Sequence, residues 1–147
     1  MNKEEIHKFL DEHRNIYLDV MIFIYYFEEN LEFLDQVTAI FEAIEQDRNK
    51  GFVSKLIFSE LLVHPYKKDM NRLIVNYIDF LHNYPNLKLI PAKEEILINS
   101  ASLRAQHNLS TPDAIHTASA IEAGCTGLIT ADQQIKCSKL DILCLEN

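Results

Sequence analysis

The segment STPDAIHTASAIEAGCTGLITAD, residues 110–132, decides the fold class because it reads as a complete helix followed by a buried strand. Thr111 can cap the helix, Pro112 suits the first helical position, and Gly124 suits a left-handed residue at the helix end. The apolar run Gly127–Thr130 that follows is typical of a parallel strand buried on both faces. The segment therefore predicts one helix–strand unit of an α/β fold.

Further apolar runs and helical patterns recur along the chain. Short β-rich runs predict strands over residues 16–18, 52–53, Leu87–Ile90, Gly127–Thr130 and 142–145. Apolar spacings of three and four predict helices with their buried faces at residues 34–44 and 70–81, expected to pair beside the sheet, and a further helix is expected over residues 94–106. With 147 residues and no long Gly, Pro or Ser linker, we expect a single domain spanning residues 1–147.

The composition is that of an ordinary globular protein, with 48% hydrophobic and 24% charged residues. No apolar run approaches the length of about 18 residues needed for a membrane span. The first residues, MNKEE, lack the character of a signal peptide, and the three cysteines show no Cys-x-x-Cys spacing. We therefore expect a cytoplasmic protein with reduced thiols and no membrane association.

The net charge of −8 argues against a broadly basic surface for nucleic acid, although clustered carboxylates would themselves carry part of that charge. Nucleotide cofactor enzymes are disfavoured because the sequence contains neither of the glycine-rich phosphate-binding motifs, Gly-x-Gly-x-x-Gly and Gly-x-x-x-x-Gly-Lys-Ser/Thr. Local basic groups are interpreted mostly as solvated surface; they are Lys67, Lys68 and Arg72, then Arg104 with His107, then Lys136 with Lys139.

Four acidic residues lie where a predicted strand gives way to a helix: Asp19, Glu60, Asp113 and Asp132. Because ligands of open α/β sheets bind at the carboxyl ends of the strands, we expect these carboxylates to share one edge. Gathered carboxylates repel one another and need a compensating charge, most simply a divalent cation. A helix cap is the alternative reading of Asp19 and Asp113 taken singly. Glu60 is the most informative, because its neighbours are strongly apolar and buried carboxylates are rare unless paired or metal-bound.

Such a site would suit phosphodiester hydrolysis, since a bound metal lowers the pKa of water and stabilises charge on a phosphate. Zinc and serine-hydrolase chemistry are disfavoured, because the His and Cys spacings are irregular and Ser54 and Ser59 have no evident histidine base. The aromatic residues of 23–27 could stack nucleic-acid bases, but their helical spacing favours core packing or an oligomer surface.

Four motifs occur in order along the chain: Tyr17-Leu18-Asp19, Ser54 with Ser59-Glu60-Leu61-Leu62, Pro112-Asp113-Ala114-Ile115-His116, and Leu128-Ile129-Thr130-Ala131-Asp132. Together they resemble the PIN-domain family, including the VapC-type toxin ribonucleases. The resemblance covers essentially the whole chain and is most specific over residues 111–132. It implies a three-layer α/β/α fold with a central, mostly parallel sheet of four to five strands.

The resemblance also implies a Mg²⁺- or Mn²⁺-dependent endonuclease, usually acting on RNA. Asp19 and Asp113 would be the main metal ligands, Glu60 and Asp132 would complete the acidic set, and Thr130 would supply a supporting hydroxyl. His116, three residues beyond Asp113, is interpreted as a supporting or packing residue rather than a ligand.

An antitoxin protein and a homodimer are further partners that the resemblance implies. Val20 and Met21 stand where the family often places a small polar residue or asparagine after the first aspartate. That departure and the acidic surface motivate an alternative function, a non-catalytic PIN-like module that binds RNA or a protein. A phosphoryl-accepting aspartate domain is a more distant alternative, in which Glu60 and Asp132 have no evident place.

Overall fold

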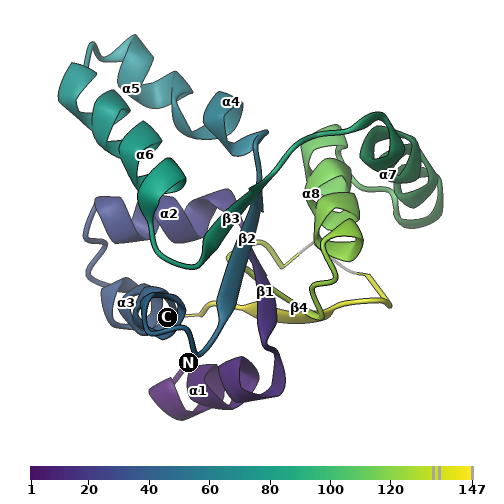
Figure 1. Ribbon diagram of the computed structural model, residues 1–147, viewed down its shortest axis with the longest axis horizontal. Helices are drawn as coiled ribbons and strands as arrows, with labels where there is room; N and C mark the ends of the chain where they lie inside the picture. Colours follow the sequence, from purple (N-terminus) through teal and green to yellow (C-terminus); the bar gives the residue numbers. More distant parts are fainter. Residues whose placement is uncertain (134, 136, 147) are drawn as a thin grey trace.

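In a computed structural model, which describes residues 1–133, 135 and 137–146, five parallel strands form one sheet between two layers of helices (Figure 1). The strands are β1 (Asn15–Leu18), β2 (Lys50–Ser54), β3 (Leu87–Ile90), β4 (Gly127–Thr130) and β5 (Asp141–Cys144). Their order across the sheet is β3-β2-β1-β4-β5, and every neighbouring pair is parallel. The predicted α/β class and mostly parallel sheet are confirmed.

The helices are α1 (Lys3–Glu12), α2 (Val20–Phe27), α3 (Leu34–Glu45), α4 (Ile57–Leu61), α5 (Val63–Lys67), α6 (Asn71–Asn83), α7 (Glu94–His107) and α8 (Thr111–Glu122). Helices α7 and α8 cover one face of the sheet, and α1, α2 and α3 lie on the other (Figure 1). Side chains alternate between these two layers along β1. Ile16 and Leu18 pack with the α1–α3 layer, while Tyr17 packs with residues of α7 and α8. Tyr17 therefore points to the same layer as Asp113 and His116.

Several predicted boundaries differ from the observed ones by a residue. The helix expected over residues 94–106 is α7, and Asn108 ends it in the left-handed conformation at φ 52°. The cap of α8 is Ser110 rather than Thr111, because the Ser110 hydroxyl accepts the backbone N–H of Asp113 at 3.3 Å. Pro112 is consequently the second residue of α8, and Gly124 follows the helix at φ 77°, as predicted.

The two helices expected to pair beside the sheet, α3 and α6, meet through aromatic side chains. The Phe41 ring of α3 lies 5.5 Å from the Phe80 ring of α6, and it lies equally far from the Tyr84 ring that follows α6. Helix α3 also packs against α1 and α2, and α6 packs against α5 and β3. Within the described residues, no helix is both long and apolar enough to cross a bilayer.

A buried asparagine fastens the end of α1 to the start of β2. The Asn49 side-chain amide donates to the backbone oxygen of Leu10 at 2.8 Å and to that of His13 at 2.6 Å. These carbonyls lie at the end of α1, where helical partners are missing. Asn49→Ala should lower the free energy of unfolding by about 2 kcal/mol, because it leaves both carbonyls buried without this donor.

Urea denaturation would measure this loss, with Asn83→Ala as the matched control, because Asn83 is exposed on α6. We expect the control to stay within about 0.5 kcal/mol of the wild type. Equal midpoints for the two variants would show that Asn49 does not carry the α1–β2 connection.

Candidate active site

The order of the strands places the end of β1 beside the end of β4. The chain runs from β1 outward to β2 and β3 on one side, whereas β4 and β5 lie on the other side. The strand order therefore reverses between the neighbouring strands β1 and β4. The carboxyl ends of the strands at such a reversal point are the usual ligand position in open α/β sheets. Asp19 directly follows β1, and its backbone N–H donates to Ile129 of β4 at 3.0 Å. Thr130 is the last residue of β4.

The carboxylate of Asp19 is held on both oxygens. Its Oδ1 accepts the backbone N–H of Val20 at 2.7 Å at the start of α2, and its Oδ2 accepts the Thr130 hydroxyl at 2.7 Å. Asp19 is therefore a helix cap, and the same geometry fixes its carboxylate at the sheet edge. Burial raises the pKa of the Asp19 carboxyl above its ordinary value, and the hydrogen bonds from Thr130 and Val20 oppose that rise.

Thr130 also connects Asp19 to the segment that carries Asp132. The Thr130 hydroxyl oxygen accepts the backbone N–H of Asp132 at 2.9 Å while its proton goes to Asp19. Burial raises the pKa of the Cys144 thiol at the end of β5, and the charges of Glu146, Asp132 and Asp19 raise it further. Asp132 and Asp19 therefore lie near the same strand ends.

Asp113 approaches the same edge from the first turn of α8. After burial and the two hydrogen bonds, the negative charge of Asp113 raises the pKa of Asp19 further. Asp113 therefore lies within electrostatic range of Asp19. Within the described residues, none of the ion pairs involves Asp19 or Asp113. No basic side chain of this part of the protein neutralises the pair directly.

Glu60 reaches the site through a histidine. From α4, its Oε1 forms a short hydrogen bond with Nε2 of His116, whose other ring nitrogen, Nδ1, lies 2.5 Å from the Tyr17 hydroxyl. The Tyr17 oxygen in turn accepts the backbone N–H of Ser54 at 2.8 Å. The His116 side chain is 4% exposed and that of Glu60 is 25% exposed.

This hydrogen-bond chain includes one functional candidate that sequence reasoning missed. Tyr17 was interpreted as part of an apolar strand, yet it is fully buried and its hydroxyl is bonded on both sides. The available signal was the tyrosine itself, because a buried hydroxyl needs a partner. The His116 ring is bonded to Glu60, and its supporting role stays a prediction.

A family comparison matches the description PIN domain over residues 16–137, most of the chain. The chain belongs to the PIN domain family. No curated protein shows significant sequence similarity to this PIN domain.

Solved structures share its fold at low sequence identity. A chain of a toxin–antitoxin complex from Klebsiella pneumoniae superposes with a TM-score of 0.59 at 22% identity, covering 80% of this chain and 86% of that one. A chain of VapBC2 from Rickettsia felis, bound to a DNA fragment from the promoter, gives 0.68 at 17% identity, with coverages of 88% and 97%. VapC20 from Mycobacterium tuberculosis, a toxin that cleaves the sarcin–ricin loop, gives 0.63 at 10% identity, with coverages of 77% and 86%.

The donor chemistry of this PIN domain fits a divalent cation held by few protein ligands. Within the described residues, no three His, Cys, Asp or Glu side chains are grouped closely enough to form a metal cage. Mg²⁺ is usually bound through one or two carboxylates and keeps several waters, so the pair of Asp19 and Asp113 suffices as a donor set. The metal-ligand roles of Asp19, Asp113, Glu60 and Asp132, and the role of Thr130, stay predictions.

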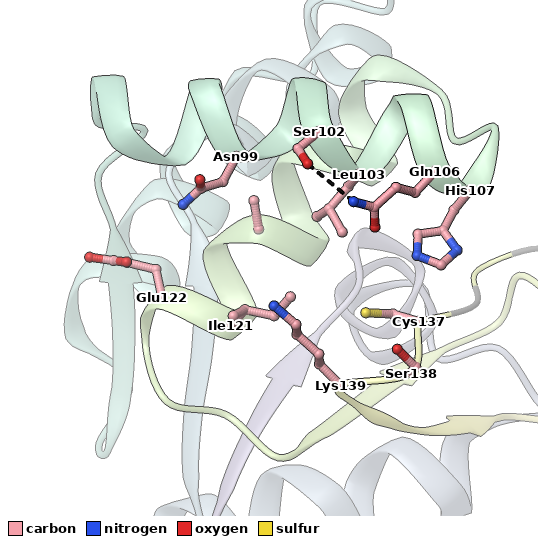
Figure 2. Close-up of a pocket in the computed structure, with 11 residues that line it drawn as sticks. Asn99, Ser102, Leu103, Gln106, His107, Ile121, Glu122, Cys137, Ser138 and Lys139 are labelled. Carbon is pink, nitrogen blue, oxygen red and sulfur yellow. Dashed lines mark hydrogen bonds between the residues drawn. The ribbon is translucent and has the colours of Figure 1, made fainter.

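A pocket of about 200 Å³ lies apart from this acidic edge, between α7, α8 and the segment before β5 (Figure 2). His107 and Lys139 line it, so two of the basic residues noted in the sequence face this pocket. None of the predicted site residues lines it. Lys136, the third basic residue of this region, lies outside the described residues.

Proposed function

We propose that this PIN domain is a Mg²⁺- or Mn²⁺-dependent endoribonuclease that hydrolyses phosphodiester bonds in RNA. The observation that carries the proposal is the half-buried carboxylate of Asp19 at the reversal point of the strand order, bonded to Thr130 and within electrostatic range of Asp113. A carboxylate whose ionisation is disfavoured by its surroundings is a common feature of functional sites. Family membership supports the same activity, because the PIN domain match over residues 16–137 includes all four acids.

Each residue has a separate part in the proposed reaction. Asp19 and Asp113 would hold the ion, which when bound lowers the pKa of water and stabilises negative charge on the phosphate. Thr130 donates to Asp19 and so keeps one carboxylate oxygen in a fixed direction. Asp132 is held through its backbone N–H, and Glu60 is held through His116. Both carboxylates would complete the acidic edge by accepting hydrogen bonds from water molecules.

Cleavage of RNA by the full chain, with Mg²⁺ or Mn²⁺ and then with a chelator, tests the activity directly. We expect cleavage with either ion and none with the chelator. Cleavage that persists undiminished in the chelator would overturn the metal-dependent mechanism.

We also propose that the protein is the toxin of a toxin–antitoxin pair, because one matched structure is described as a toxin–antitoxin complex and another as a toxin. An antitoxin would place a basic side chain among the carboxylates, since their negative potential is its complement. A homodimer in the cytoplasm is the expected state of the free protein. Its mass in solution, measured by light scattering, would be that of two chains; a mass of one chain would contradict the dimer.

A second candidate function is a non-catalytic module that binds RNA or a protein. The absence of a three-ligand group among the described residues favours it, as does the engagement of Glu60 by His116. Mn²⁺ separates the two candidates, because a module without a metal site would gain no stability from the ion.

Thr130→Val should reduce cleavage about tenfold to 100-fold, because the change removes the hydroxyl that orients Asp19 and binds the Asp132 N–H. Thr130→Ser keeps the hydroxyl and is the matched control, for which we expect a rate close to that of the wild type. Initial rates at several Mg²⁺ concentrations provide the measurement. Equal rates for the valine and serine variants would exclude a role for the hydroxyl.

A further inference from the structure

A buried chain of hydrogen bonds runs from the sheet to the acidic edge. It begins at the backbone N–H of Ser54 in β2, passes through the Tyr17 hydroxyl in β1 and the His116 ring in α8, and ends at Glu60 in α4. Tyr17 is 0% exposed and His116 is 3% exposed, so bulk water does not compete for these bonds. Four elements that are separate in the sequence are thereby joined next to Asp19.

The number of protons in this chain fixes its direction. The Tyr17 oxygen accepts the Ser54 N–H, and its single proton has Nδ1 of His116 as its acceptor. In the neutral imidazole ring the one proton is then on Nε2, where it donates to Glu60. With the opposite tautomer, the Tyr17 proton would lose its acceptor and a nitrogen lone pair would face the carboxylate, which is costly in a buried site.

Glu60 contacts His116 and also borders a pocket. Its helix α4 has only five residues, and Glu60 lines a pocket of about 200 Å³ together with Ile24, His64 and Tyr77. The bond between its Oε1 and the His116 ring of α8 is the contact that holds the carboxylate on the α8 side.

We propose that Tyr17 and His116 are positioning residues, which fix the Nε2–H tautomer of His116 and thereby hold the Glu60 carboxylate at the acidic edge of the sheet. The proposal rests on the proposed function, in which Glu60 belongs to the nuclease site. Asp19 directly follows β1, so the strand that leads to Asp19 also carries Tyr17, the residue that sets Glu60 through His116.

The first test needs neither metal nor RNA. Long-range ¹H–¹⁵N NMR of the full chain at mildly alkaline pH distinguishes a protonated ring nitrogen from an unprotonated one. His116 should show an unprotonated Nδ1 and a protonated Nε2, and Tyr17→Phe should shift the ring toward a tautomer mixture. A protonated Nδ1 in the wild type would overturn the assignment, as would an unchanged spectrum in Tyr17→Phe.

The second test uses cleavage rates in a double-mutant cycle. Tyr17→Phe should reduce cleavage about tenfold in the wild type and have no further effect when Glu60 is already glutamine. His116→Gln keeps an N–H donor and should lose less activity than His116→Leu. If Tyr17→Phe costs the same with Glu60→Gln as without it, the residue acts on folding or elsewhere and the proposal fails.

Thermal unfolding of each variant provides the control for folding, because Tyr17→Phe leaves the buried Ser54 N–H without its acceptor. Rates are compared at a temperature where all variants are folded. A wild type that shows the predicted tautomer yet does not cleave RNA would refute the proposed nuclease while supporting the hydrogen-bond chain. A wild type that cleaves RNA but has the opposite tautomer would refute only the positioning role.

Discussion

Asp113→Asn is expected to abolish RNA cleavage, with a loss greater than about 100-fold, since replacing a supporting group alone typically costs tenfold to 100-fold. The substitution removes the negative charge of Asp113, which adds to the effect of burial in raising the pKa of Asp19, while keeping the size of the side chain. The fold should persist, because α8 is capped by Ser110 and the Asp113 backbone bonds are unaffected. Initial cleavage rates in Mg²⁺, together with the unfolding temperature, measure both expectations.

Asp11→Asn is the matched control, because it makes the same chemical change at an exposed position on α1. This variant should cleave RNA at the wild-type rate. If Asp113→Asn is folded and also cleaves at that rate, the acidic edge is not the catalytic site.

Mn²⁺ is expected to stabilise the wild type against unfolding, and a chelator should reverse that effect together with all cleavage. Binding to the folded state alone contributes about 2.7 kcal/mol when the free ion is 100 times its dissociation constant. Because the ion would be held by Asp19 and Asp113, the same titration of Asp19→Asn should show little or no stabilisation. Calorimetric unfolding over a series of Mn²⁺ concentrations gives this comparison.

Without metal, the charge of Asp19 should oppose folding. Burial raises its pKa in the folded protein, so the stabilising contribution of the protonated form is present at low pH and is lost as the pH rises through the raised pKa. At neutral pH in a chelator, Asp19→Asn should therefore unfold at a temperature no lower than the wild type, and asparagine remains a good cap for α2. A strongly destabilised Asp19→Asn would show that the carboxylate serves the fold rather than a ligand.

The positioning of Glu60 relates these predictions to one another. Tyr17 is two residues from Asp19 along the chain and is bonded to the His116 ring that holds Glu60, so this phenol connects the two acids. A protein that only needed a packed core could place phenylalanine there without burying a hydroxyl. The tyrosine is explained if β1 must place two carboxylates. It leads directly to Asp19, and through Tyr17 and His116 it holds Glu60.

The sequence by itself determined the α/β class, the strands β3 and β4 with their bounds, the left-handed glycine after α8 and the family. Local chemistry suffices for these features, because parallel strands buried on both faces are continuous apolar runs and helix ends carry their own capping residues. The cap of α8 was placed one residue late because Ser110 and Thr111 are both good caps, and only the hydroxyl geometry selects between them.

Only the tertiary structure decided which side chains meet at the acidic edge. Thr130 and Asp19 are 111 positions apart, Tyr17 and His116 are 99 apart, and His116 and Glu60 are 56 apart. Their contacts depend on β4 inserting next to β1 and on α8 packing against the sheet at β2, and neither arrangement leaves a local periodic signal. A hydrogen bond is set by distances of a few tenths of an ångström, whereas a sequence pattern specifies only the face on which a residue lies.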